Sequence, residues 1–170
     1  VMAPDTEQTD PRPLRLFLSW AHRDETLKDD LVRRLTPRLK ILAGVTFQWW
    51  EDSLLWPGEQ WRLGILGRLE ECDYAIQLLS PEFFASDFIV NHEIPPFVGE
   101  RPRKACIPMG LSPVNLDGSQ NLRGIDALQI FTLHGKSFSE VRDTTRNEFA
   151  SQLASEIQRR IIGGEQWRAL

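Results

Sequence analysis

Short apolar runs alternate with amphipathic segments along most of the chain, and this alternation limits the fold more than any other feature of the sequence. The apolar runs have the length and composition of buried strands. Between them, apolar residues recur every three or four positions among charged ones, as they do on one face of a helix. Such alternation predicts parallel strands joined by helical crossovers, with helices on both faces of the sheet. The predicted strands cover residues 14–20, 45–50, 73–79, 105–109 and 128–133.

Capping residues mark where two of the predicted helices begin. Asp24 precedes a helix whose leucines recur at every fourth position from 27 to 35, and we predict that it is the N-cap. Ser80 followed by Pro81 predicts an N-cap with proline at the first helical position. That helix is expected to reach Pro95, with a break near Ser86. Apolar stripes predict two more helices, at Trp61, Ile65 and Leu69 and at Phe149, Leu153, Ile157 and Ile161.

The composition narrows the class of protein. The chain has 170 residues, of which 41% are hydrophobic, which is enough for one domain with its own core. A formal net charge of -4 and a pI of about 5.4 argue against direct binding of nucleic acid. Cys72 and Cys106 lie in apolar stretches without metal-binding spacing, which predicts two buried free thiols in a reducing compartment. No run is long enough to span a membrane and no signal-peptide pattern is present, so we expect a cytoplasmic protein.

The two ends of the chain differ from its centre. Residues 1–13 are polar and contain three prolines, which predicts a flexible leader. Residues 14–163 carry all the predicted strands and helices and form the predicted domain. We interpret residues 164–170 as a C-terminal tail or as the start of a linker to a further domain, such as a fused sensor.

Several familiar motifs of α/β proteins are missing from the sequence. No GxxxxGK[ST] loop and no GxGxxG motif follows the first predicted strand, which argues against P-loop and Rossmann-type nucleotide sites. The segment GLSPV at 110–114 lacks the final glycine of a hydrolase nucleophile elbow. A phospho-receiver domain would carry an aspartate at the end of its third strand, where this chain has Leu79 and Ser80. Because ligands bind beyond the carboxyl ends of parallel strands, we expect functional residues at those ends.

Three segments, taken together, resemble the Toll/interleukin-1 receptor (TIR) domain family. LFLSWAHRDE at 16–25 resembles the family's first strand and the loop after it. WEDSLLWPGEQW at 50–61 is similar to the family's BB loop, without a gap. LEECDYAIQLLSPEFFASDFIVNHE at 69–93 resembles the following helix, strand and helix, which end at the family's glutamate. The order and spacing of the three segments make the resemblance specific.

The resemblance implies both a fold and an activity. The implied fold is α/β, the flavodoxin-like TIR fold, with about five parallel strands and helices on both faces. The bacterial, NAD-cleaving branch of the family implies an NAD+ hydrolase that breaks the nicotinamide–ribose bond and releases ADP-ribose or a cyclised form. Glu93 is then the catalytic carboxylate, and NAD+ is a substrate, so that no cofactor is implied.

The chemistry of NAD cleavage explains why one carboxylate is enough. Ordinary glycosidases use two carboxyl groups, because a departing sugar alkoxide needs a proton. Nicotinamide leaves NAD as a neutral molecule and needs no general acid. What remains is a cationic ribosyl group, which a fixed anion in a dry cleft stabilises. We therefore expect Glu93 to contact the ribose hydroxyls on the nicotinamide side.

The substrate-binding candidates each have a structural alternative. Arg23, with His22 beside it, is expected to contact the phosphates, and its alternative is a surface salt bridge. Asp52 is more simply explained as a cap for the backbone of its own loop. For Trp50, three roles remain open, namely stacking on a base, packing in the core and contact with another protein. The remaining candidates are Trp20, where the family usually has tyrosine, and Ile89, where many NAD-cleaving members carry tryptophan.

Two further hypotheses concern Glu93 and the function of the whole domain. Ile89 and Glu93 are four positions apart and therefore share one face of the predicted helix. The alternative for Glu93 is an exposed surface glutamate. The alternative function is a non-enzymatic module that pairs with other TIR domains for signalling. For the enzyme, the resemblance implies partners that are other TIR protomers, whose BB loops complete each other's clefts, and a role as an effector of bacterial antiviral defence.

Overall fold

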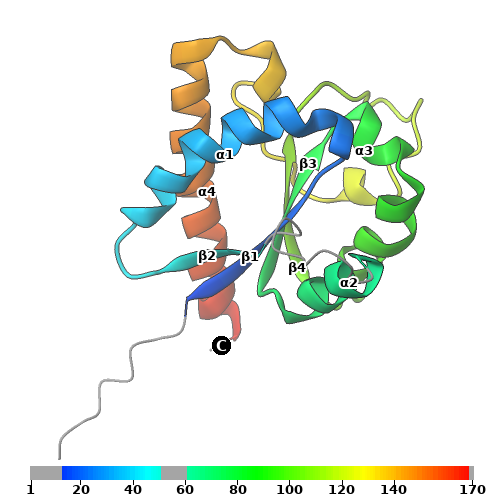
Figure 1. The fold of residues 1–170 in the computed structure, drawn as a ribbon, viewed down its shortest axis with the longest axis horizontal. Coiled ribbons are helices and arrows are strands. Elements are labelled where there is room, and N and C mark those ends of the chain that lie inside the picture. Colours follow the sequence, from blue (N-terminus) through cyan, green and yellow to red (C-terminus); the bar gives the residue numbers. More distant parts are fainter. Residues whose placement is uncertain (1–12, 51–60, 169–170) are drawn as a thin grey trace, which may run out of the picture.

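The computed structural model describes residues 13–50 and 61–168, and within them it has the predicted parallel sheet with helices on both faces (Figure 1). Four parallel strands form the sheet in the order β2-β1-β3-β4. The strands are β1 (Leu14–Ser19), β2 (Phe47–Trp50), β3 (Tyr74–Leu79) and β4 (Ala105–Gly110). The fold class is thus confirmed, although the described sheet has four strands where about five were expected.

Each face of the sheet is covered by a pair of helices (Figure 1). The helices α1 (Glu25–Lys40) and α4 (Asp143–Arg168) pack on one face, against Leu16 and Leu18 of β1. The helices α2 (Trp61–Glu71) and α3 (Pro81–Ala85) lie on the other face, which carries Phe17. Short helical turns connect these elements, including 3-10 turns at His22–Asp24, Pro95–Phe97, Ile125–Ala127 and Phe138–Glu140 and a π turn at Ile89–Glu93.

The fifth predicted strand, at 128–133, is reduced to a single bridge in the described structure. Phe131 pairs with Met109 of β4, its N–H donating to the Pro108 carbonyl at 2.8 Å while Gly110 N–H donates to the Phe131 carbonyl at 2.9 Å. In a parallel ladder the next bond toward the start of β4 would come from the N–H of residue 108. Proline has no N–H, so the ladder cannot extend in that direction. Toward the end of β4 the ladder also stops, because the Leu133 N–H donates to the Lys136 carbonyl in a turn and not to β4.

The predicted N-caps Ser80 and Asp24 both stand directly before their helices, but only Ser80 caps its helix through its side chain. The Ser80 hydroxyl accepts a hydrogen bond from the Phe83 N–H at 3.0 Å, and the helix it caps ends at Ala85, so that the predicted break lies at Ser86. Asp24 does stand directly before α1, but its side chain makes no capping bond. Its carboxylate instead accepts a hydrogen bond from the Ser80 hydroxyl, because both residues are buried where the ends of β1 and β3 meet.

The two cysteines are both free thiols, and they differ in burial. Cys72 is buried, as predicted, and burial raises the pKa of its thiol to about 11. Cys106 is only half-buried, which corrects the prediction, since β4 lies at one edge of the described sheet. Burial nevertheless raises the pKa of the Cys106 thiol to about 12. Among residues 13–50 and 61–168, no helix combines the length and apolar character needed to cross a membrane.

Candidate functional site

A cavity of about 480 Å³ opens where β1 and β3 end. The strand order β2-β1-β3-β4 reverses direction between these two strands, because β2 lies on one side of β1 and β3 on the other. Ligands of open α/β sheets bind at such a switch point, beyond the carboxyl ends of the strands. The cavity is lined by Phe17, Leu18, Trp20, Ala21, His22, Arg23, Ile65, Glu82, Ala85, Ser86, Phe88, Ile89 and Glu93.

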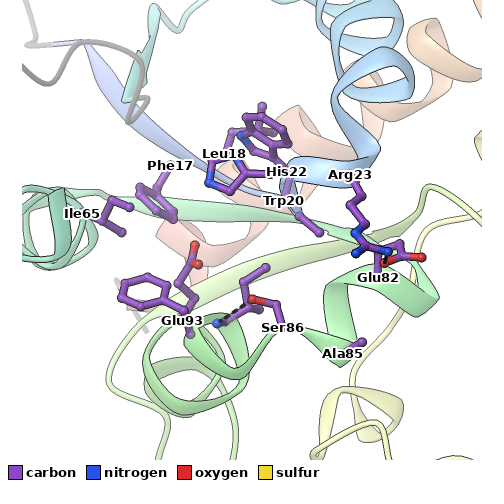
Figure 2. Close-up of a pocket in the computed structure, with 13 residues that line it drawn as sticks. Phe17, Leu18, Trp20, His22, Arg23, Ile65, Glu82, Ala85, Ser86 and Glu93 are labelled. Carbon is purple, nitrogen blue, oxygen red and sulfur yellow. Dashed lines mark hydrogen bonds and ion pairs between the residues drawn. The ribbon is translucent and has the colours of Figure 1, made fainter.

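Glu93 is a buried carboxylate on the wall of this cavity. Its exposed fraction is only 6%, so the alternative of a surface glutamate is wrong. The Ser19 hydroxyl, at the end of β1, donates a hydrogen bond to Oε1 of Glu93 at 3.0 Å. Figure 2 shows the carboxylate pointing into the cavity, with Trp20 and His22 on the opposite side. The structure therefore places an acidic group in a largely apolar hollow.

A π turn at Ile89–Glu93 presents the carboxylate. The turn follows the break at Ser86, where the chain leaves α3, and is closed by the Ile94 N–H donating to the Ile89 carbonyl at 2.9 Å. Pro95 and Pro96 come next, and the first cannot continue a helix because it lacks an N–H. Single π turns within helices are frequent at functional sites. As predicted from their spacing, Ile89 and Glu93 face the same hollow.

Aromatic and basic groups form the opposite wall. Trp20 and His22 meet edge to face, with ring centroids 5.3 Å apart. The ammonium group of Lys28, from α1, lies 4.3 Å from the centroid of the Trp20 ring and also pairs with Asp29 at 2.6 Å. A cation over an indole face is an attractive contact. Trp20 is thus held in position from two sides while it lines the cavity.

Arg23 stands at the mouth of the cavity. Its guanidinium lies 4.0 Å from the carboxylate of Glu82 on α3, and its side chain is 85% exposed (Figure 2). Both hypotheses for Arg23 are therefore compatible with its position: it makes a surface ion pair, and it lines the cavity. Such an exposed pair contributes about 0–1 kcal/mol to stability, so exchange of Glu82 for another anion costs little.

The apolar wall of the cavity comes from β1, α2, α3 and the π turn. Phe17 of β1 and Ile65 of α2 belong to one core cluster. Ile89 belongs to another cluster and is buried, so the wall is aliphatic at this position. Phe88 also lines the cavity and packs against the ring of His92, with centroids 4.9 Å apart.

The candidates of the predicted BB loop lie partly outside the described residues. Asp52 falls within 51–60, which the structure does not describe. Trp50 is the last residue of β2, and its Cα pairs with that of Phe17 in the cavity wall. The structure does not describe the side chain of Trp50. Trp49, the residue before it, packs on the large core cluster and donates from Nε1 to the Thr36 hydroxyl at 2.9 Å.

Sequence reasoning missed two polar residues of this region. Ser19 holds Glu93, and Lys28 covers the ring of Trp20. A signal for Ser19 was present, since it is the polar residue that closes an otherwise apolar run after Phe17 and Leu18. Lys28 carried no signal, because charged residues are expected on the outer face of any helix. Across the described ranges, no three His, Cys, Asp or Glu side chains gather into a metal site.

Comparison with known proteins agrees with the geometry. A family model described as "TIR domain" matches residues 16–153, which include most of β1, all of β2, β3 and β4, the cavity wall and the first part of α4. A comparison with curated proteins found no match. TIR domains include both signalling modules, which bind other TIR domains, and NAD-cleaving enzymes. With this match over most of its length and a parallel sheet of the matching kind, the chain belongs to the TIR domain family.

Proposed function

We propose that this TIR domain is an NAD+ hydrolase and that Glu93 is its catalytic carboxylate. The observation that carries the proposal is the position of Glu93, which is 6% exposed and lines a cavity of about 480 Å³ beside Trp20. A buried acidic group in a cleft at the switch point of the sheet is an arrangement that catalytic sites favour. The proposal extends the family assignment to one activity and one residue.

The proposed reaction breaks the bond between nicotinamide and C1′ of the ribose. The bonding electron pair leaves with the ring nitrogen, so the pyridinium departs as neutral nicotinamide. The ribosyl group is left with a positive charge, which the Glu93 carboxylate stabilises from within the apolar hollow. Water then adds at C1′ and releases a proton, which gives ADP-ribose; addition of an adenine nitrogen instead gives a cyclised product.

The cavity suits the nicotinamide–ribose half of the substrate. A volume of about 480 Å³ is in the usual range for small-molecule sites. In the proposed complex, Phe17, Ile65 and Ile89 contact the nicotinamide ring. The phosphates lie at the mouth, where Arg23 exchanges Glu82 for a phosphate oxygen and His22 stands beside it. Trp20, which lines the cavity, contacts the ribose or the nicotinamide ring in the proposed complex.

We also propose that self-assembly completes the site. Trp50, the last residue before the segment 51–60, is the Cα partner of Phe17 in the cavity wall, so β2 ends beside the site. In the proposed assembly, residues of this segment, including Asp52, contact the neighbouring protomer or its substrate. An effector role in bacterial antiviral defence and a cytoplasmic location are proposed from the family resemblance alone.

One observation favours the second candidate function, a non-enzymatic pairing module. Ile89 is aliphatic and 3% exposed, so this position offers no flat ring for stacking on nicotinamide or adenine. A domain that only binds other TIR domains has no need of such a ring. The same assay decides between the two functions, because only the enzyme releases nicotinamide.

The deciding experiment is incubation of the concentrated protein with NAD+, with nicotinamide release followed by chromatography. The expected result is release by the wild type and none above background by Glu93→Ala. Glu100→Ala is a matched control, because Glu100 is an exposed glutamate outside the cavity lining. Circular dichroism of all three proteins checks that they are folded. Nicotinamide release that survives Glu93→Ala, or its absence from the wild type at every concentration, would contradict the proposal.

A further inference from the structure

Gln77 is a polar side chain buried within the sheet, and among the described residues its amide has no hydrogen-bond partner. Its exposed fraction is 0%, and both Nε2 and Oε1 are without a partner. Buried amide groups are almost always hydrogen-bonded, because burying one unpaired costs free energy of folding. An apolar residue would avoid this cost, as Ile76 and Leu78 do on the same strand. Packing alone therefore does not explain why this position carries an amide.

The sheet places Gln77 directly beside the residue that holds Glu93. Gln77 of β3 and Ser19 of β1 are Cα partners in the parallel ladder, so their side chains leave the same face of the sheet. Neighbouring strands are about 4.8 Å apart, which is within the reach of a glutamine side chain. The face is the one below the cavity, because Ser19 donates to Oε1 of Glu93 at 3.0 Å. Ala75 and Leu79, two positions on either side, also pack on this face.

We propose that Gln77 is a positioning residue for Glu93. Once the cavity is occupied, the Nε2 amino group donates a hydrogen bond to the Glu93 carboxylate and supplements the bond from Ser19. A neutral donor suits this place, since it fixes the carboxylate without cancelling the negative charge that the ribosyl cation requires. This inference rests on the proposed function, because it assigns Gln77 a part in the same reaction.

The first test is the kinetics of Gln77→Met, which removes the amide and keeps a side chain of similar length. We expect kcat to fall about tenfold while KM changes less than about twofold, because the lost interaction acts on the carboxylate in the transition state. The melting temperature should not fall, since the variant no longer buries an unpaired amide. Leu78→Met is the control, being a buried position on the same strand that faces the opposite side.

The second test uses charge and does not depend on activity. Gln77→Glu sets a second carboxyl group beside Glu93, and like charges in contact disfavour each other. We expect the melting temperature of Gln77→Glu to fall as the pH is raised from 5 to 8, and the double variant with Glu93→Gln to recover at least half of that fall. In an active protein, the acidic limb of the kcat profile should also move to higher pH in Gln77→Glu.

The outcomes separate this inference from the proposed function. A kcat of Gln77→Met within twofold of wild type would overturn the positioning role and leave Gln77 as a packing residue. Failure of Glu93→Gln to recover the stability of Gln77→Glu would overturn the contact itself. Absence of NAD cleavage by the wild type would instead remove the proposed function, while the melting experiment would still decide whether the two side chains meet.

Discussion

The Ser19 hydroxyl fixes one oxygen of the Glu93 carboxylate at the point where β1 ends. Ser19 is completely buried, so its hydrogen bond is not exchanged freely with water. A bond from a neutral donor to a charged acceptor contributes about 1.5–3 kcal/mol. The orientation of the candidate catalytic group therefore depends on a strand of the core and not on a loop.

Replacing Ser19 tests this dependence. We expect Ser19→Ala to lower the free energy of unfolding by about 1–3 kcal/mol, because a buried carboxylate loses a donor. NAD cleavage should fall about tenfold in kcat with little change in KM, because the carboxylate is still present but less well oriented. Chemical denaturation and nicotinamide release measure the two effects. Unchanged stability together with unchanged kcat would show that the hydroxyl does not hold Glu93.

Asp24 provides a pH-dependent test near the same site. Burial raises the pKa of its carboxyl above the ordinary 3.8; the hydrogen bond from Ser80 opposes this rise and the charge of Glu82 adds to it. Between 3.8 and the raised pKa, the folded state binds more protons than the unfolded state, so stability falls as the pH rises through this window. At neutral pH the ionised carboxylate is therefore a cost to the fold.

Asp24→Asn removes this cost and keeps an oxygen that accepts from Ser80. We expect the variant to melt at a higher temperature than wild type at pH 7, and the difference to shrink as the pH approaches 3.8. Thermal melts over a series of pH values check the prediction. A wild type that is more stable than the variant at pH 7 would show that the negative charge itself is stabilising.

Glu93 illustrates what can be predicted for a single residue and what cannot. Its candidacy came from family motifs whose spacing ends at this position, and its spacing from Ile89 correctly placed both on one face. Its burial and its bond from Ser19 could not be predicted. The two residues are 74 positions apart, and no local pattern in the sequence connects them.

At the scale of secondary-structure elements, a network of charged groups joins α1 to α4. Arg34 of α1 is buried, and its guanidinium donates to the Asp143 carbonyl and to Oδ1 of Asn147, both at 2.8 Å. It also donates to Asp30 at 2.9 Å. Burial raises the pKa of Asp30, but bonds from surrounding arginines, Arg34 first among them, outweigh burial and lower that pKa below 3.8. The network therefore holds α1 and α4 together on the face of the sheet opposite the cavity.

Arg34→Met tests how much this network contributes to the stability of the fold. We expect a loss of about 1.5–3 kcal/mol in the free energy of unfolding, because buried hydrogen bonds from a charged donor disappear and leave their acceptors less well paired. The control is Arg33→Met, since Arg33 contacts the same Asp30 at 2.6 Å but its side chain is 70% exposed. That substitution should change stability by less than about 0.5 kcal/mol. Equal effects of the two variants in urea denaturation would contradict the assignment.

The elements themselves were largely predictable, and Pro108 shows where prediction failed. Four strands and their helices follow from apolar runs and helical periodicity, because each element buries a face. The fifth run, at 128–133, is equally apolar but depends on a partner that can donate hydrogen bonds. Pro108 in β4 removes one donor on that side. A proline in the neighbouring strand was visible in the sequence, but its effect depends on a pairing that the sequence does not reveal.

At the scale of the molecule, the order of the strands creates the site. The order β2-β1-β3-β4 brings the ends of β1 and β3 together, and the cavity opens there. The alternation of elements predicted a parallel sheet and ligand binding at the strand ends, but it did not predict this order. The π turn that carries Glu93 then closes the cavity from a different part of the chain.

Self-assembly is a prediction at the same scale. If the segment 51–60, which follows Trp50, completes the site of a neighbouring protomer, the rate of NAD cleavage should rise more steeply than linearly with protein concentration. Doubling the protein concentration at fixed NAD+ is then expected to raise the rate more than twofold until assembly is complete. Initial rates over a dilution series, with the oligomeric state followed by light scattering, make the measurement. A strictly proportional rate would show that one protomer holds the whole site.

The most direct test of the central claim concerns the charge at position 93. Glu93→Gln preserves the size of the side chain and its ability to accept from Ser19 but removes the negative charge. The account predicts that the folded variant releases nicotinamide at least about 100-fold more slowly than wild type at the same concentration of NAD+ and protein. A rate within a few-fold of wild type would contradict it, since a neutral amide cannot stabilise a ribosyl cation in the same way.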